Sequence, residues 1–369
     1  MASALAALVV LFLGLPIARF GRRMGWQFMA SSGSLPVIAT PPALTGGITL
    51  ALGIGSAVLI FPALHWPAAP LIGAVILLLA GQIHDRFTGA DRIQVIAVLL
   101  VALIVALTTN RPGATSAFAF PGLETLVGVV VLAVAITVFQ LSDRADGLTD
   151  GLALIACVGI IIASYVLVVE GDERHHLSRL APLLLVLTSM LMALSLYTWR
   201  HSGRRHSIVM LGSGGAMMLG LLTGWLALQT QTGLSGSTIG PGMLAWLFTI
   251  PLFDAGVLLL RALTSRKSQR AQIPFRAVHL LQAQIVSRRR SVATLLALGW
   301  LLAIGGVAAW SLGVPDAVLL VAWLLLFAAH ATFTLVYWHR RSATPGPDWT
   351  RPESDDSHAD AAQSPAADR

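Results

Sequence analysis

Long apolar stretches recur along almost the whole chain, and they limit the fold more than any other feature of the sequence. A helix needs about 20 predominantly apolar residues to cross a bilayer, with a range of roughly 17 to 25. Eleven stretches meet this requirement, at approximately 1–17, 42–64, 67–83, 93–109, 123–139, 152–169, 180–197, 208–228, 243–263, 292–312 and 317–337. The sequence therefore predicts an all-α polytopic membrane protein with about eleven transmembrane helices.

Composition supports a single membrane domain. Of the 369 residues, 56% are hydrophobic and only 11% are charged, and the mean hydropathy is +0.78, which excludes a soluble domain of average makeup. We expect a membrane domain over 1–341. The segment 342–369 is rich in Ser, Asp, Ala and Pro without apolar periodicity, so we expect a disordered tail. Cys157 is the single cysteine and lies in an apolar run, so no intramolecular disulfide forms.

The basic residues predict the orientation. Arg19, Arg22 and Arg23 follow the first apolar run and none precedes it, which is the wrong polarity for a cleaved signal peptide. With the N-terminus outside, all but three of the 24 Lys and Arg residues fall in inner loops or the inner tail. Cytoplasmic loops are enriched in these residues, so we predict N-out and C-in. Their spread over many short loops argues against nucleic-acid binding.

A short polar turn separates the fifth and sixth apolar runs. Asp143, Asp146 and Asp150 lie in it, although an ionisable group at the bilayer edge is costly without partners. In a helical turn the three would share one face. The Asp-Gly pairs equally suit a turn followed by a helix cap, and Thr149 and Asp150 are then capping residues of the sixth run. Both geometries aim the carboxylates at one small volume and predict a metal ion or arginine cluster nearby.

The predicted topology places the other unusual polar residues on the cytoplasmic side as well. They are His84 and Asp85 at the end of the third run, Gly212 to Gly215 at the start of the eighth, Asp254 in the ninth, and His279 in the loop that follows. We predict one cytoplasmic cleft for an anionic ligand. Carboxylates there would hold Mg²⁺, which shares oxygen ligands with substrate phosphates. The glycines would open a helix whose backbone N–H groups suit a phosphate.

Six segments in chain order carry a resemblance to a known family. They are Thr40 to Ile48, Gly81 to Phe87, Gln140 to Leu148, Met210 to Ala216, Pro251 to Asp254, and Pro274 to Gln282. These segments resemble motifs of the polyprenyl-phosphate N-acetylhexosamine-1-phosphate transferases. In chain order, the first three resemble Pro-x-x-Gly-Gly, then Asp-Asp-Arg, then Asn-x-x-Asp-Gly-x-Asp-Gly-Leu. The last three resemble Met-Gly-Asp-x-Gly-Ser, then Pro-Leu-x-Asp, then Pro-Phe…His-x-His-His.

The resemblance implies both a reaction and a set of site residues. Members of the family transfer a HexNAc-1-phosphate from a UDP-sugar to a polyprenyl phosphate such as undecaprenyl phosphate, release UMP, need Mg²⁺ (with Mn²⁺ as a substitute), and initiate cell-envelope glycans at the bacterial inner membrane. The implied catalytic residues are Asp85, Asp143 and Asp146. The implied metal ligands are Asp85, Asp146 and Asp254. The implied substrate-binding residues are Gln140, Arg144, Gly212, Ser213, Gly214, His279, Gly46 and Gly47.

Departures from the motifs leave three interpretations open. His84 replaces an Asp, Gln140 an Asn, Arg144 a Gly and Ser213 a metal-binding Asp, while Leu281 and Gln282 replace two histidines. The first interpretation is an active, divergent transferase. The second is an inactive paralogue that keeps the fold and binds lipid phosphate or a partner. The third, ranked last, is a secondary transporter, which would need broken spans in paired halves. The sequence leaves open whether the protein forms a homodimer.

Overall fold

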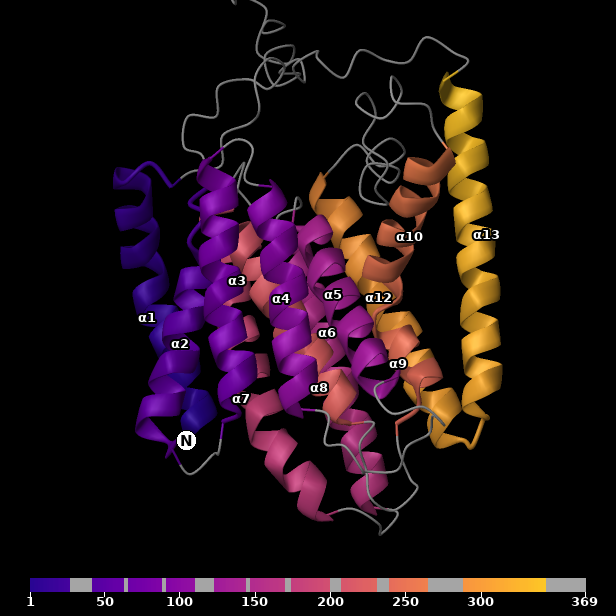
Figure 1. Cartoon of the computed structure of the whole chain (residues 1–369), viewed down its shortest axis with the longest axis horizontal. Coiled ribbons are helices and arrows are strands. Elements are labelled where there is room, and N and C mark those ends of the chain that lie inside the picture. Colours follow the sequence, from indigo (N-terminus) through magenta and orange to yellow (C-terminus); the bar gives the residue numbers. More distant parts are fainter. Residues whose placement is uncertain are drawn as a thin grey trace, which may run out of the picture.

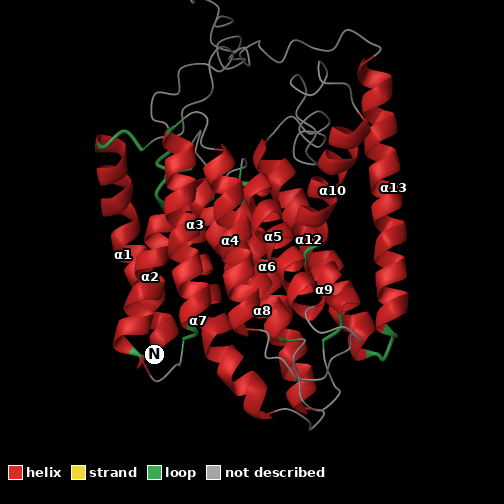
Figure 2. Cartoon of the chain, viewed as in Figure 1, coloured by secondary structure: helices red, strands yellow, loops and turns green. Residues whose placement is uncertain are grey.

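The computed structural model describes residues 1–26, 42–62, 66–87, 91–109, 123–143, 147–169, 174–199, 207–230, 239–264 and 288–342. Within these residues the protein is a bundle of helices without strands (Figure 2). The helices are α1 (Ala2–Arg23), α2 (Gly46–Ile60), α3 (Ala68–Arg86), α4 (Asp91–Thr109), α5 (Leu123–Ser142), α6 (Leu148–Val169), α7 (Arg174–Thr198), α8 (Gly212–Gln229), α9 (Pro241–Leu247), α10 (Thr249–Thr264), α12 (Arg288–Ser311) and α13 (Asp316–Ser342).

The predicted all-α membrane fold is confirmed, because every predicted apolar run falls on a helix or, for the ninth, on the pair α9 and α10. Eight of the described helices are long and apolar enough to cross a membrane, and the bent pair α9 and α10 makes nine. α2 has 15 residues, fewer than a full crossing needs, and α8 is not among the eight. A count of eleven crossings therefore stays a prediction, as does the N-out orientation.

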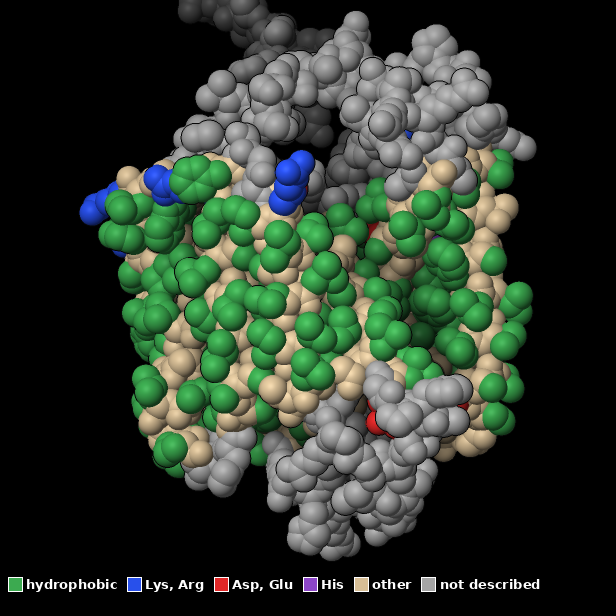
Figure 3. Space-filling view, in the orientation of Figure 1, with side chains coloured by type: hydrophobic (Ala, Val, Ile, Leu, Met, Phe, Trp, Pro, Cys, Tyr) green, Lys and Arg blue, Asp and Glu red, His purple; other side chains and the backbone are tan. Residues whose placement is uncertain are grey.

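Successive helices alternate in direction, so the polar residues collect at one end of the bundle. α1, α3 and α5 finish at the end where α2, α6 and α8 begin (Figure 1). We call this the polar end, and the opposite one the far end. Lys and Arg side chains lie along the rim of the polar end in Figure 3, whereas hydrophobic side chains cover the sides of the bundle. Arg19, Arg23, Arg86 and Arg92 are exposed there. An apolar belt with a charged rim is the surface expected of a chain embedded in lipid.

α8 is the central helix. Of its 18 residues, all but Ser213, Leu228 and Gln229 are buried, and it packs mainly against α3 and α5. Glycines allow these helices to approach until their backbones touch. A Cβ atom on Gly81 would lie 2.2 Å from the Cα of Gly214, and one on Gly220 would lie 2.6 Å from the carbonyl oxygen of Ala135. Small residues at such contacts are typical of membrane helix pairs.

The ninth apolar run is broken rather than straight. α9 and α10 meet at an angle of 88° around Phe248. Pro251 has no backbone N–H to pair with the carbonyl of Leu247, and its ring would clash there, so a continuous helix is disfavoured. In α10, Pro251 is the third residue, where no intrahelical N–H bond is needed. The sequence predicts one continuous run over 243–263, and the structure corrects this to two helices. A proline alone does not reveal the break, because α1 and α7 also contain a proline and continue past it.

α13 holds the broken pair in place. The Asp316 carboxylate accepts hydrogen bonds from the backbone N–H groups of Gly242 (3.0 Å) and Met243 (3.1 Å) at the start of α9. In α10, Phe253 packs against Trp323 and Phe327 of α13, with ring centroids 5.2 and 5.3 Å apart. The bend is thus fixed at both of its arms by one neighbouring helix.

Candidate functional site

The pair Asp85 and Ser213 joins two motif segments at the polar end. Asp85 is the penultimate residue of α3 and Ser213 the second residue of α8. The backbone N–H of Ser213 donates to Asp85 Oδ2 at 2.9 Å, and its hydroxyl donates to Oδ1 at 2.5 Å. Asp85 therefore caps the start of α8, where a negative charge also favours the helix dipole. The Asp85 side chain is exposed, so it remains accessible to a ligand.

The local backbone explains why glycine precedes Ser213. Gly212 has φ +74°, the left-handed region in which only glycine is unstrained. A Cβ there would lie 3.1 Å from Asp85 Oδ2 and 3.7 Å from Gln82 Nε2. Gln82 in turn donates to the carbonyl of Leu44, at 3.4 Å. The backbone at the start of α8 therefore packs closely against the end of α3.

The other predicted substrate-binding glycines are buried between helices. Gly46, Gly47 and Gly214 are all buried. A Cβ on Gly47 would lie 2.5 Å from the Cα of Gly215, and one on Gly214 would lie 2.4 Å from the carbonyl oxygen of Leu78. Close packing accounts for glycine at these positions without a ligand. The assignment of the three to substrate binding stays a prediction, and the structure gives them a packing role beside it.

The acidic turn begins as α5 ends. Gln140 is in the last turn of α5, and the N–H of Asp143 donates to its carbonyl at 3.3 Å. Asp143 is half-buried. Arg144 and Asp146 lie outside the described residues. Gly147, with φ +75°, separates the turn from α6, so the described part favours a turn followed by a helix over one continuous helical face.

Asp150 does more than cap α6. Its carboxylate is 2% exposed and accepts a hydrogen bond from the hydroxyl of Thr198 on α7 at 2.7 Å, as well as one from the backbone of Gly151. Thr149 is 1% exposed and its hydroxyl has no hydrogen-bond partner among the described residues, so the capping interpretation of Thr149 finds no support there. The sequence reasoning missed Thr198, which carries no local signal because its partner is distant in sequence.

Asp254 lies in α10 and is 8% exposed. Over the described part of the chain, no three His, Cys, Asp or Glu side chains gather closely enough to form a metal site by themselves. The predicted ligand Asp146 and the predicted diphosphate-binding residue His279 fall outside that part. His84, in place of the motif's first Asp, has its Nδ1 3.3 Å from Asp91 Oδ1. The metal assignments of Asp85, Asp146 and Asp254 stay predictions.

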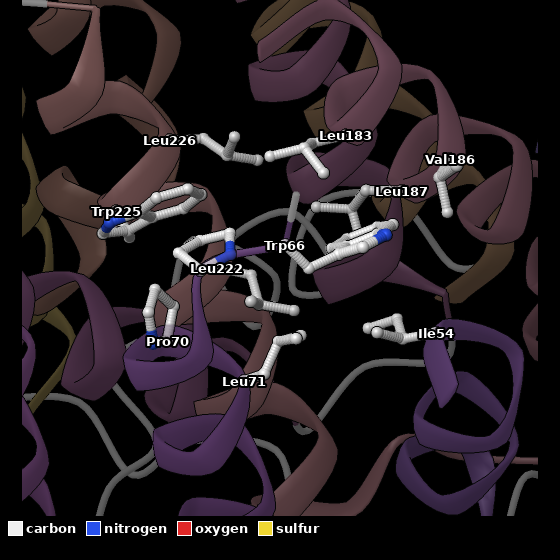
Figure 4. Close-up of a pocket in the computed structure, with 11 residues that line it drawn as sticks. Ile54, Trp66, Pro70, Leu71, Leu183, Val186, Leu187, Leu222, Trp225 and Leu226 are labelled. Carbon is white, nitrogen blue, oxygen red and sulfur yellow. The ribbon is translucent and has the colours of Figure 1, made fainter. Parts of the chain in front are cut away.

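An apolar pocket lies at the far end, away from this site. Residues of α2, α7, α8 and the start of α3 line it, and their side chains face a common space in Figure 4. The indole nitrogens of Trp66 and Trp225 are buried there and have no hydrogen-bond partner within the described ranges. The lining contains no charged side chain that could neutralise a phosphate.

Comparison with known proteins points to the same part of the chain. Residues 67–231, which contain the Asp85 and Ser213 pair and the acidic turn, match the model of glycosyl transferase family 4. The chain is similar to the undecaprenyl-phosphate alpha-N-acetylglucosaminyl 1-phosphate transferases of three bacteria. Identity is 28% for Escherichia coli (strain K12), over 69% of each chain, 29% for Salmonella typhimurium (strain LT2), over 70% of each, and 28% for Yersinia pestis, over 77% of this chain and 78% of the relative.

These matches agree with the helical membrane fold and with the order of the motif segments along the chain. The chain is therefore similar to glycosyl transferase family 4 over residues 67–231, and to these three bacterial transferases over more of its length.

Proposed function

We propose that this protein transfers a HexNAc-1-phosphate from a UDP-sugar to undecaprenyl phosphate at the cytoplasmic face of a bacterial inner membrane, and so initiates a cell-envelope glycan. The relatives are named for transfer of this kind to undecaprenyl phosphate. The observation that carries the proposal is the exposed carboxylate of Asp85, held by Ser213 at the arginine-rich polar end of the bundle.

The reaction exchanges one phosphoanhydride for another. An oxygen of the lipid phosphate forms a bond to the phosphorus that bears the sugar, and the bond from that phosphorus to the UMP oxygen breaks, so that UMP leaves with the electron pair. Both substrates are anionic, so charge stabilisation and alignment supply most of the catalysis. Exposed arginines such as Arg23, Arg86 and Arg92 at the polar end favour the approach of such substrates.

We expect an open magnesium site at the polar end, completed by the substrates. Mg²⁺ keeps several waters and is usually held by one or two carboxylates together with substrate phosphates. Both Asp85 oxygens accept bonds from Ser213, but each carboxylate oxygen has a second lone pair. We expect Asp85 to contribute a ligand, with Asp146 and Asp254 as further candidates. When bound, Mg²⁺ or Mn²⁺ would neutralise charge on the diphosphate.

The lipid tail has to remain in the bilayer while its phosphate reaches the polar end. Figure 3 shows a hollow lined with hydrophobic side chains between α13 and the rest of the bundle. Phe333 and Val336 of α13 and Leu259 of α10 are exposed large hydrophobic residues on these helices. A hydrocarbon chain can lie along such a surface without burying a polar group, which is compatible with a polyprenyl substrate.

One contact favours a second candidate, an inactive paralogue that binds lipid phosphate. Ser213 stands where the family motif has a metal-binding Asp, and it engages both oxygens of Asp85. Because His84 also replaces a motif Asp, the site has two carboxylates fewer than the motifs. The Asp85 carboxylate that remains is hydrogen-bonded to Ser213. A transporter receives less support, because paired repeats would carry two broken spans and the described helices contain one bent pair.

The test is UMP release by purified protein with undecaprenyl phosphate, Mg²⁺ or Mn²⁺, and a panel of UDP-sugars. Metal-dependent release that also requires the lipid supports the proposal. Asp143→Asn should then abolish turnover without loss of fold. The matched control is Asp91→Asn, because Asp91 is a polar-end carboxylate with 80% side-chain exposure, and its activity should be unchanged.

Ser213→Asp separates the two candidates. If the natural protein releases no UMP and Ser213→Asp does, the lost carboxylate is the cause of the inactivity, and the natural protein is an inactive paralogue. If neither the natural protein nor Ser213→Asp releases UMP with any donor of the panel, but undecaprenyl phosphate still binds, the proposed transfer reaction is overturned. A lipid-binding protein is then favoured. Full turnover by Asp143→Asn would remove Asp143 from the mechanism.

A further inference from the structure

The start of α6 is held by two consecutive residues of α7. Thr198, the last residue of α7, donates its hydroxyl to Asp150 Oδ2 at 2.7 Å. Trp199 follows it, and a Cβ on Gly147 would lie 2.5 Å from the Trp199 Cδ1 atom. The acidic turn leaves through Gly147 and enters α6 at Leu148. The segment from Gly147 to Asp150 is therefore held against the end of α7 by two contacts. One is the buried hydrogen bond from Thr198, and the other is the contact of Gly147 with the Trp199 ring.

The Asp150 contact is unusual for a helix cap because it is buried and joins two helices. Asp150 and Thr198 are each 2% exposed. The alternative acceptor for the Thr198 hydroxyl, the carbonyl of Leu194 in its own helix, is farther away at 3.4 Å. An exposed side chain suffices to cap a helix, whereas burial of a carboxylate is costly unless it is hydrogen-bonded. Capping alone therefore leaves the burial and the link to α7 unexplained.

A third contact closes the other side. A Cβ on Gly151 would lie 2.6 Å from Leu296 Cδ2 of α12, so the first turn of α6 is fitted closely between α7 and α12. Lateral movement of this turn requires Leu296 to shift or the Asp150 hydrogen bond to break. Asp143 lies only four residues before Gly147, so we expect movement at the start of α6 to displace Asp143 as well.

We propose that Asp150 and Thr198 form a positioning pair that fixes the acidic turn, and with it Asp143, in the geometry needed for turnover. This inference rests on the proposed transferase function. The pair acts through the turn and touches neither substrate. A positioning role predicts a loss in kcat rather than in folding, since misplacement of a reacting group by about 1 Å can cost up to 10²-fold in rate.

The experiment compares Thr198→Val with Thr198→Ser. Valine removes the hydroxyl at similar volume, whereas serine keeps it. We expect Thr198→Val to fold but to lower kcat by roughly ten- to a hundredfold, with a lower thermal midpoint because the buried Asp150 loses its donor. Thr198→Ser should recover most of the activity and of the midpoint. The matched control is Thr223→Val in α8, because Thr223 is 0% exposed and its hydroxyl bonds only to carbonyls of its own helix. Its kcat should be unchanged.

Hydrogen exchange of the backbone gives a second readout that needs no turnover. Amides over 143–151 should exchange faster in Thr198→Val than in Thr223→Val or Thr198→Ser. Unchanged exchange there would overturn the proposal. So would a lowered midpoint with unchanged kcat for the folded protein, because the pair would then be structural only. If the natural protein releases no UMP, the proposed function fails, and the exchange rates still decide whether the pair holds the turn.

Discussion

The contact between Gly81 and Gly214 allows a quantitative test of how α3 and α8 are held together. In Gly81→Ala the new Cβ would lie 2.2 Å from the Gly214 Cα and backbone N, which is 1.2 Å less than the 3.4 Å at which ordinary contact begins. The obstructing atoms are backbone, so no rotamer change relieves the clash and the helices must separate. Overpacking of this kind costs about 1 to 3 kcal/mol. We expect a lower thermal midpoint, measured by circular dichroism in detergent.

The control is Gly55→Ala in α2, where a Cβ meets nothing within 4 Å. Both variants gain the intrinsic helix preference of alanine over glycine, about 1 kcal/mol. The difference between their thermal midpoints therefore reports the cost of overpacking alone. For a shift of roughly 2 °C per kcal/mol, Gly81→Ala should unfold about 2 to 6 °C below Gly55→Ala. It should also lose activity, because separation of α3 from α8 pulls Asp85 away from Ser213. Equal midpoints would refute the view that backbone contact at Gly81 sets the helix spacing.

Three further predictions concern the broken span and the metal. Asp316→Ala leaves the N–H groups of Gly242 and Met243 without their acceptor, so the free energy of unfolding should fall by about 1 to 2 kcal/mol, and an unchanged midpoint in thermal unfolding would contradict the capping role. Trp323→Phe keeps an aromatic ring in the cluster but removes the hydrogen bond of 3.0 Å to Thr249, and should cost about 0.5 to 1.5 kcal/mol, measured in the same way. Chelation with EDTA should abolish UMP release and Mg²⁺ or Mn²⁺ should restore it; release that persists in EDTA would exclude a required divalent metal.

Much of the architecture could be predicted because it depends on local composition. Lipid crossing needs a continuous apolar run, so each run appears as a helix, or as the pair α9 and α10, whatever its neighbours are. Boundaries were less accurate. α1 continues to Arg23 and α6 begins at Leu148, because helices extend past the apolar region into the polar rim. α8 begins at Gly212 instead of Ile208, since Val209 pairs with Ala43 in an isolated bridge before the helix starts.

The candidate site was only partly predictable. The motif order pointed to Asp85 and Ser213, and the structure shows that they are bonded to each other. Their separation of 128 residues means that no periodicity could reveal the pair. The sequence predicts that Gly212, Gly214 and Gly215 open a phosphate-binding helix, but Gly214 and Gly215 pack closely against the backbone of α3 and α2. A glycine needed for close packing and a glycine needed for a ligand look identical in a sequence.

The sequence by itself determined that this is a helical membrane protein, where its helices lie, and which family motifs it carries, because each of these depends on residues close together in the chain. Only the tertiary structure decided that Asp85 caps α8, that Asp150 is tied to Thr198, and that Asp316 holds the bent helices. These contacts depend on which helices become neighbours. That choice is made by side-chain volumes and by hydrogen bonds between distant segments, and both are settled only when the whole bundle packs.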